Sequence, residues 1–356
     1  MKIIITSPSL DTNQNVSGIS SVTQFIISYN TENEYLHFNI GRKDNEKRNL
    51  TWVFRILGIY LKWSYLMVTR KDIIIHFNLA LSKDSIIRDS PLIMIARIFR
   101  KHMIIHVHGG DFLMHKKNPL WMNRLLKLVL SGKNPVIVLS PLEEKVIQEK
   151  FNCNKIFVLP NCIGLKEATF FDRSYSNDDS LILLFLGRIS TDKGIEYILT
   201  AMKSLKKKGI KFKFIMAGKG PEEKIFIQKF NDLLGMDFEF KGVVSGDKKT
   251  ELLKRCNVFI LPSFYEGLPM ALIESMSFGL VPITTNVGSI KYVINDGTNG
   301  IIVNTHSSED IAFAIEKLSK YKEYKQELSK NARQYILDNF NPEIYISRLN
   351  EIYNYE

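Results

Sequence analysis

Short apolar segments, rich in isoleucine and valine, alternate with longer helical patterns along the whole chain. Strands that are buried on both faces of a parallel sheet have this continuously apolar character. Because strands that alternate with helices build doubly wound sheets, the pattern predicts an α/β fold with parallel sheets. The strands are expected at residues 2–6, 35–40, 72–77, 103–107, 136–139, 156–159, 181–186, 212–217, 238–241, 258–261, 281–284 and 300–303.

The chain is too long for one core. It has 356 residues, whereas single hydrophobic cores stop growing at about 250–300 residues. The polar stretch 172–180 separates the two series of strands and is the best candidate linker. We therefore expect two Rossmann-like domains that face a cleft, residues 1–165 and residues 166–340. Residues 341–356 are expected to form a helix that packs back on the first domain.

Composition excludes several classes of protein. Hydrophobic residues make up 45% and charged residues 24% of the chain, which excludes disordered and collagen-like proteins. The cysteines are too few for a disulfide framework or a structural zinc site: Cys153, Cys162 and Cys256. We expect no signal peptide, because residues 1–6 are too short for a secretory apolar core. We also expect no spanning helix, because the most apolar stretch, 52–68, carries Arg55 and Lys62.

The net charge of +11 is concentrated in the front half. Residues 1–170 hold 23 basic and 13 acidic residues, against 25 and 24 in residues 171–356. Segment 42–71 alone holds eight basic and two acidic residues, with interleaved aromatic residues Trp52, Tyr60, Trp63 and Tyr65. This mixture suits a bilayer interface, where cations meet lipid phosphates and rings lie at headgroup level. The alternatives are a core helix with a solvated basic side, and a nucleic-acid-binding protein, although no RNA motif or recognition-helix pattern accompanies the charge.

Segment 261–274 is the strongest candidate for a ligand site. It reads LPSFYEGLPMALIE, which predicts a strand end, a loop and a helix start. The residues that lead into the helix are Gly267, Leu268 and Pro269. A helix N-terminus offers free amides and a positive dipole end to an anion. A diphosphate there would have the carboxylates of Glu266 and Glu274 on either side, one near sugar hydroxyls and one near ribose hydroxyls. The alternative is two solvated glutamates.

A second motif adds two cations. Gly187, Arg188 and Lys193 follow the first strand of the back half. At the carboxyl edge of a sheet, two cations can grip a pyrophosphate and offset charge that develops on it. The alternative is an exposed basic loop. A third turn, GKGPEE from Gly218, begins like a dinucleotide fingerprint, but Glu223 stands at its third glycine position, which argues against a nicotinamide enzyme.

The front half offers two candidates. Gly18 follows the first strand in a loop of small residues, where it would let a phosphate or sugar approach the backbone. An ordinary turn glycine is the alternative. His106 and His108 share a face at the end of a buried strand, so a metal is conceivable. No further ligand spacing supports a metal, and a core role is the simpler interpretation of His106.

Together these motifs resemble the GT-B glycosyltransferases of family 4, the retaining glycosyl transferases group 1. The resemblance is carried by Glu266 and Glu274 as Glu-x7-Glu, Gly187, Arg188 and Lys193 as Gly-Arg-x4-Lys, Gly218 to Pro221 as Gly-x-Gly-Pro, and Gly18 and His108 in the front half. It is strongest from residue 181 to residue 303. Two segments depart from the family pattern: 161–164 reads NCIG instead of Asn-Gly-Val-Asp, and 288–292 reads GSIKY instead of Gly-Gly-x-Pro-Glu.

The resemblance implies transfer of a sugar from a nucleotide-sugar donor to an acceptor hydroxyl with retained anomeric configuration. Arg188 and Lys193 would stabilise the charge on the leaving nucleoside diphosphate. Glu274 would bind the ribose and Glu266 the hydroxyls of the donor sugar. No enzyme nucleophile is expected, because the acceptor is thought to attack on the leaving-group face while a donor phosphate oxygen takes its proton.

The resemblance implies that residues 1–165 form the acceptor-side domain and residues 166–340 the nucleotide-sugar-binding domain, with donor contacts from both. His108 would contact the sugar from the opposite domain, Gly18 would admit the phosphate, and Gly187 and Gly218 would line the donor site. No Asp-x-Asp pair occurs in the chain, so we expect no metal and no cofactor, with a UDP-sugar favoured over a GDP-sugar. The sugar moved would be a hexose or an N-acetylhexosamine.

The acceptor is expected to be a lipid-linked saccharide in the synthesis of bacterial surface polysaccharide, namely O-antigen, capsule or exopolysaccharide. The protein would then be cytoplasmic and peripheral on the inner face of the cell membrane, with an anionic membrane surface and no nucleic acid as partner. A sugar-nucleotide epimerase on the same fold is the alternative enzyme. It would turn over the donor without an acceptor.

Overall fold

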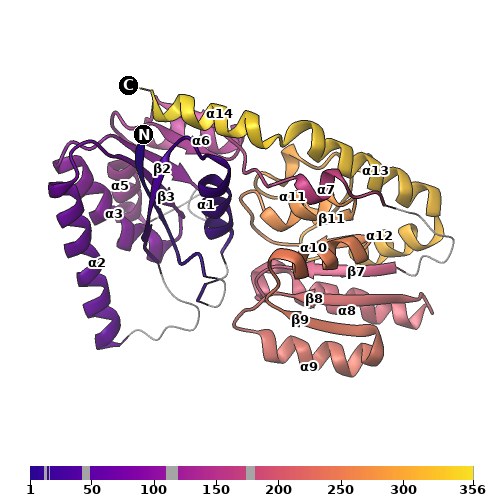
Figure 1. Cartoon of the computed structure of the whole chain (residues 1–356). Coiled ribbons are helices and arrows are strands. Elements are labelled where there is room, and N and C mark those ends of the chain that lie inside the picture. The colour runs from indigo at the N-terminus through magenta and orange to yellow at the C-terminus, as the bar shows by residue number, and fades with distance from the viewer. Residues whose placement is uncertain (12–13, 16, 42–48, 110–118, 174–180, 356) are drawn as a thin grey trace. The chain divides into compact units, whose positions relative to one another are not determined.

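The structure is a computed structural model that describes residues 1–11, 14–15, 17–41, 49–109, 119–173 and 181–355. The chain divides into two compact units, drawn in Figure 1. Unit 1 comprises Met1–Asn161 and Pro342–Glu356, and unit 2 comprises Cys162–Asn341. The last helix of the chain thus belongs to the same unit as the first strand.

Unit 1 is built on a six-stranded parallel sheet with the order β2-β1-β3-β4-β5-β6. Its strands are β1 (Lys2–Ser7), β2 (Glu34–Asn39), β3 (Ile74–Leu79), β4 (Met103–Val107), β5 (Val136–Val138) and β6 (Ile156–Val158). Strand β3 runs to Leu79, two residues beyond the predicted end. The polar Asn78 continues the strand because its buried amide donates to the carbonyl of Thr6, at 2.7 Å.

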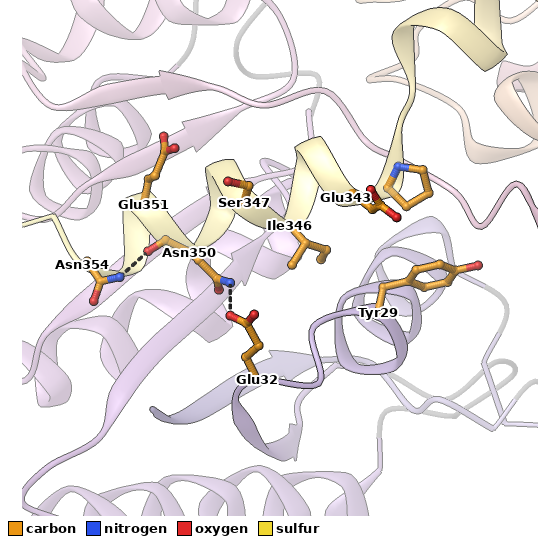
Figure 2. A pocket seen from close by; sticks show the side chains of 9 residues that line it. Tyr29, Glu32, Glu343, Ile346, Ser347, Asn350, Glu351 and Asn354 are labelled. Carbon is orange, nitrogen blue, oxygen red and sulfur yellow. Dashed lines mark hydrogen bonds between the residues drawn. The ribbon is translucent and has the colours of Figure 1, made fainter.

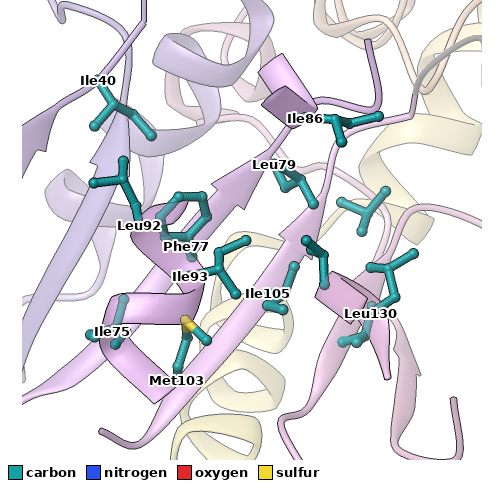
Figure 3. Close-up of a cluster of buried hydrophobic side chains, with 14 of the residues drawn as sticks. Ile40, Ile75, Phe77, Leu79, Ile86, Leu92, Ile93, Met103, Ile105 and Leu130 are labelled. Carbon is teal, nitrogen blue, oxygen red and sulfur yellow. The ribbon is translucent and has the colours of Figure 1, made fainter. Parts of the chain in front are cut away.

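Helices cover the sheet of unit 1. They are α1 (Gly18–Tyr29), α2 (Leu50–Thr69), α3 (Lys83–Ile98), α5 (Leu120–Leu130), α6 (Pro141–Phe151) and α14 (Pro342–Tyr353). Figure 3 shows the core between strands and helices, where Phe77 of β3 lies with Leu92 and Ile93 of α3. The core also holds Trp63 of α2, which is fully buried.

Unit 2 is built on a second six-stranded parallel sheet, with the order β12-β11-β10-β7-β8-β9. Its strands are β7 (Leu181–Leu186), β8 (Phe212–Ala217), β9 (Phe238–Gly242), β10 (Val258–Leu261), β11 (Val281–Thr285) and β12 (Ile301–Val303). Its helices are α7 (Lys166–Thr169), α8 (Ile195–Lys207), α9 (Glu223–Leu234), α10 (Gly246–Arg255), α11 (Met270–Ser277), α12 (Ser308–Lys320) and α13 (Lys322–Asn339), with short 3-10 turns η1 (Thr191–Lys193), η2 (Gly235–Asp237) and η3 (Ile290–Tyr292).

The strand orders identify where each sheet can bind a ligand. In unit 2 the chain leaves β7 toward β8 and later returns to pair β10 on the other side of β7. In unit 1 the corresponding reversal lies between β1 and β3. Ligands of doubly wound sheets bind beyond the carboxyl ends of the strands at such reversals. The two sheets confirm the predicted fold class. Gly18 follows β1, and Arg188, Lys193 and Glu266 follow β7 and β10.

None of the helices in the described part of the chain combines the length and the apolar character that crossing a bilayer requires.

Candidate functional site

The loops after β7 and β10 meet through a partly buried ion pair in unit 2. Lys193, at the end of η1, donates from Nζ to Oε1 of Glu266 at 2.7 Å. The two side chains are only 18% and 12% exposed. Ser263 Oγ donates to the same carboxylate oxygen, also at 2.7 Å. Lys193, the predicted cation, and Glu266, the predicted sugar-binding carboxylate, are therefore direct partners. Ser263, to which the sequence assigned no role, is a second donor to Glu266.

Backbone contacts hold these two loops together. The amide of Phe264 donates to the carbonyl of Asp192 at 2.9 Å. Gly194, which ends η1, has φ +71°, and a Cβ there would lie 2.3 Å from the carbonyl oxygen of Pro262. Only glycine fits at a positive φ against another backbone. The position of Lys193 is thus fixed by the chain next to it.

The segment after β11 packs against the backbone of Glu266 and Gly267. Gly288 has φ +55°, and a Cβ there would lie 1.7 Å from the carbonyl oxygen of Glu266. The amide of Ser289 donates to the carbonyl of Gly267 at 3.1 Å. Although residues 288–292 depart from the family pattern, the glycine at their start packs directly under the Glu266 loop.

Glu274 lies in helix α11 and has a lysine partner of its own. Lys249, in α10, donates from Nζ to Oε1 of Glu274 at 2.6 Å. Their side chains are 26% and 17% exposed. Each carboxylate of the Glu-x7-Glu motif therefore holds one lysine. Sequence reasoning missed Lys249 because it stands among other lysines of an amphipathic helix, and only the folded chain brings it to Glu274.

The start of α11 lies between the two glutamates. Pro269 is the cap residue immediately before the helix, one position earlier than the first helical turn that the sequence predicted. Leu268 is buried, at 4% exposure, so its backbone is the part that could meet a ligand. Glu266 precedes the helix and Glu274 lies within it, as predicted.

Arg188 differs from Lys193 in its surroundings. Its side chain is exposed, and within the described ranges it has no ion-pair partner. Next to it, the amide of Gly187 donates to the carbonyl of Ala217 at 3.1 Å. A Cβ on Gly218, where φ is +135°, would lie 1.8 Å from the carbonyl oxygen of Gly187. The two glycines thus let the turns after β7 and β8 pack back to back, with Arg188 projecting from them.

His108 and Gly18 belong to unit 1, at the carboxyl edge of its sheet. His108 Nε2 donates to Oδ1 of Asn78 at 2.6 Å, and Asn78 in turn donates to Thr23 Oγ1 at 3.0 Å. Gly18 begins α1, and a Cβ there would meet nothing within 4 Å, so the fold of unit 1 does not itself require glycine. Three neighbours from these predicted motifs, Val16, Gly110 and Asp111, lie outside the described residues.

His108 adjoins a chain of buried histidines. Its ring centroid lies 4.1 Å from that of His106, whose Nδ1 lies 3.1 Å from Nε2 of His76. His76 Nδ1 lies 2.7 Å from the hydroxyl of Tyr353 in α14. Burial lowers the pKa of His76 to about 4, and burial together with the nearby His76 lowers the pKa of His108 to about 3. These imidazoles are neutral at pH 7, and His106 is a buried core residue. Nowhere in the described residues do three or more His, Cys, Asp or Glu side chains form a group that could hold a metal ion.

A separate cavity lies between α1 and α14 in unit 1, seen in Figure 2. It has a volume of about 480 Å³. Asn350 donates to Glu32 across it at 3.4 Å. The cavity is lined by Tyr29, Glu32, Pro342, Glu343, Ile346, Ser347, Asn350, Glu351 and Asn354. None of the predicted site residues contributes to it.

Comparison with known proteins gives a family match. Residues 166–335 match the family model described as glycosyl transferases group 1. The chain is 29% identical over 163 residues to the alpha-D-kanosaminyltransferase of Streptomyces kanamyceticus, with 44% of this chain and 41% of that protein covered. It is 28% identical over 234 residues to the GalNAc-alpha-(1->4)-GalNAc-alpha-(1->3)-diNAcBac-PP-undecaprenol alpha-1,4-N-acetyl-D-galactosaminyltransferase of Campylobacter jejuni, with 65% and 62% covered. The chain spans about half the length of the curated relatives it matches.

Solved structures share the fold over the whole chain. Sucrose-phosphate synthase from Thermosynechococcus elongatus has a TM-score of 0.79 at 17% identity, with 99% of this chain and 98% of that chain covered. HepE of Anabaena in complex with UDP-glucose has a TM-score of 0.74 at 15% identity, with the same coverage. These likenesses agree with the two-sheet architecture of units 1 and 2.

Proposed function

We propose that the protein is a retaining glycosyltransferase, because residues 166–335 match the family model of glycosyl transferases group 1. It moves a hexose or N-acetylhexosamine from a nucleotide-sugar donor to a hydroxyl group of a saccharide acceptor. The donor is a UDP-sugar rather than a GDP-sugar, and no metal ion takes part. The product contributes to a bacterial surface polysaccharide.

One observation carries this proposal. The Lys193–Glu266 pair, with Ser263 on the same carboxylate oxygen, lies at the strand reversal of unit 2 and just before α11. A diphosphate at the helix start attracts the nearby Lys193. A carboxylate has about four lone-pair sites, so Glu266 can keep its serine partner and accept hydroxyl groups of the donor sugar as the lysine turns to phosphate.

The roles of the other site residues follow from the negative charge that develops on the leaving diphosphate. In the proposed reaction the bond between the anomeric carbon and the β-phosphate oxygen breaks, and the acceptor oxygen bonds to the same face of the sugar. The acceptor proton passes to a donor phosphate oxygen. Arg188 and Lys193 offset the negative charge that develops on the diphosphate. Glu274 accepts hydrogen bonds from the ribose.

A structural neighbour and a sequence relative support the choice of donor and acceptor. HepE of Anabaena was solved with UDP-glucose, and the Campylobacter jejuni relative is named for an acceptor on undecaprenol diphosphate. We propose by analogy a UDP-sugar donor and a lipid-linked saccharide acceptor. The protein would then work in the cytoplasm, peripherally on the inner face of the cell membrane.

Release of nucleoside diphosphate tests the proposal. A panel of UDP- and GDP-sugars is incubated with the full-length protein, with and without lipid extract from bacterial membranes. We expect release from one UDP-sugar that rises strongly with the extract, and a lipid product with retained configuration by NMR. Conversion of the donor to another sugar nucleotide without extract would favour the epimerase instead, and no turnover of any donor would reject transfer from these sugars.

A further inference from the structure

Helix α2 of unit 1 exposes a continuous apolar stripe. The stripe consists of six large residues, given with their exposed fractions: Leu50 (77%), Phe54 (70%), Leu57 (50%), Leu61 (73%), Tyr65 (66%) and Val68 (58%). Steps of three and four residues place them on one side of a helix. Single exposed apolar residues are ordinary on a protein surface, but a row along a whole helix marks an interaction site.

The opposite face of α2 is fixed to the core. Trp63 is fully buried, and its Nε1 donates to the carbonyl of Leu92 in α3 at 2.9 Å. The hydroxyl of Tyr60 donates to the carbonyl of Arg88 in the same helix at 3.0 Å. Because these contacts hold α2 against α3, the helix cannot rotate to bury the stripe. The sequence-based expectation that Trp63 lies at headgroup level is wrong, since the ring belongs to the core.

Charges along α2 indicate what covers the stripe. Residues 50–69 contain no Asp or Glu. Lys62 is exposed and follows Leu61 by one residue, which places it about 100° around the helix from the stripe. The exposed Arg70 and Lys71 stand at the end of the helix. An apolar row with cations beside it, and no anions within it, complements an anionic surface over an apolar interior.

We propose that α2 is the surface by which unit 1 docks on an anionic lipid bilayer. The helix lies parallel to the membrane, with the stripe at the boundary between headgroups and acyl chains and with the cations on lipid phosphates. Figure 1 shows α2 next to α3 along unit 1. The exposed stripe of α2 contains none of the residues proposed for the donor, so docking does not depend on glycosyl transfer. The basic segment 42–48 before α2 lies outside the described residues and is not needed for it.

A fluorescent label on the stripe tests the proposal. The three native cysteines are buried, so Leu61→Cys supplies one exposed thiol for a polarity-sensitive dye. Phe313→Cys in α12 of unit 2, where the native side chain is 68% exposed, is the matched control. We expect a blue shift at residue 61, and none at residue 313, with vesicles of phosphatidylcholine and phosphatidylglycerol. A shift at both positions or at neither would overturn the proposal.

Vesicle sedimentation supplies the second measurement. Phe54→Ser with Leu61→Ser should lower partitioning into the same vesicles at least tenfold, equivalent to about 1.4 kcal/mol. Ile225→Ser with Phe313→Ser, two exposed apolar residues of unit 2, should leave it unchanged. Added salt and pure phosphatidylcholine should each weaken wild-type binding.

Two results would count against the lipid surface. Equal sedimentation of the stripe variant and the wild type would overturn the proposal. So would a lipid-free dimer that the stripe variant converts to a monomer, because the stripe would then be an interface between copies of the chain. Neither assay contains a donor, so failure of glycosyl transfer cannot be mistaken for failure of docking.

Discussion

At the scale of single residues, the two cations of the Gly-Arg-x4-Lys motif differ in how they are held. Lys193 is largely buried on Glu266, whereas Arg188 is exposed on the neighbouring turn. We expect Arg188→Ala and Lys193→Ala each to lower kcat by roughly 10²–10³, or about 2.7–4 kcal/mol, as for the loss of one donor to a developing charge. Lys320→Ala, in an exposed pair with Glu316 of α12, is the control. Near wild-type kcat in both folded variants would remove these residues from the mechanism.

Substitutions of the two glutamates should affect different steps, nucleotide binding for Glu274 and turnover for Glu266. Glu274→Ala is expected to weaken binding of free UDP, and Glu266→Ala is expected to lower kcat with little change in UDP affinity. Lys249→Ala should also weaken UDP binding, because it releases Glu274 from its position. Calorimetry on a double-mutant cycle checks this: Lys249→Ala should have no effect in the Glu274→Ala background. Additive losses would mean that Lys249 acts on its own, and an affinity loss confined to Glu266→Ala would reverse the roles.

At the scale of elements, we expect the segment after β11 to be needed for both stability and turnover, although its sequence departs from the family pattern. Gly288→Ala places a Cβ against the Glu266 carbonyl, so the loop must shift. Gly209→Ala is the matched control, since Gly209 has φ +70° with nothing within 4 Å. Gly209→Ala should lower the free energy of unfolding by roughly 1–2 kcal/mol, because alanine is strained at a positive φ, and it should keep full turnover. Gly288→Ala should cost more and lose turnover at least tenfold. If Gly288→Ala and Gly209→Ala had the same urea midpoint and the same turnover, the contact between Gly288 and the Glu266 loop would be refuted.

The buried imidazoles that join β3, β4 and α14 predict a pH dependence of unit 1. Their folded-state pKa values lie below the usual 6.5, at about 4 for His76 and about 3 for His108, because burial disfavours the charged form. As the pH falls below 6.5 the unfolded state takes up protons first, so the unfolding free energy falls from pH 6.5 toward pH 4. Glu143 opposes this trend, because burial raises its pKa to about 7.

All three tryptophans lie in unit 1, so tryptophan fluorescence in urea follows this dependence. We expect lower urea midpoints at pH 5 than at pH 7.5. Glu143→Gln should steepen the fall by removing the opposing group. A midpoint that is constant, or that rises toward pH 5, would contradict the buried cluster.

The strands were predictable because their physical signal is local. A continuously apolar run such as Ile3–Ile5 has few alternatives to a strand buried on both faces. Strand β3 was misjudged at its end because Asn78 looks polar until its buried partners are known. Helix α2 is apolar on two sides, and no periodicity tells which side packs on α3. Lys249 and Glu274 lie in different helices, so their ion pair arises only from the packing of α10 and α11.

At the scale of the whole molecule, the proposed roles are divided between the two units. Unit 2 holds the Lys193–Glu266 and Lys249–Glu274 pairs and the helix start proposed for the donor diphosphate. Unit 1 holds His108, Gly18 and the exposed stripe of α2 proposed for the membrane. Lys193 and Glu266 follow β7 and β10, which flank the reversal of unit 2, and Gly18 follows β1 at the reversal of unit 1. Within unit 2 the ion pairs join segments far apart in sequence, which is why the motifs alone could name Glu266 and Glu274 but not all of their partners.

The central claim is metal-independent sugar transfer supported by the cations of unit 2. Its most direct test is the rate of UDP release from the active UDP-sugar, with lipid extract as acceptor and excess EDTA present. We predict that wild-type turnover is unchanged by EDTA, while Lys193→Ala falls roughly 10²–10³-fold under the same conditions. Turnover that EDTA abolishes and that Mg²⁺ or Mn²⁺ restores would contradict the account, because a metal ion would then hold the diphosphate.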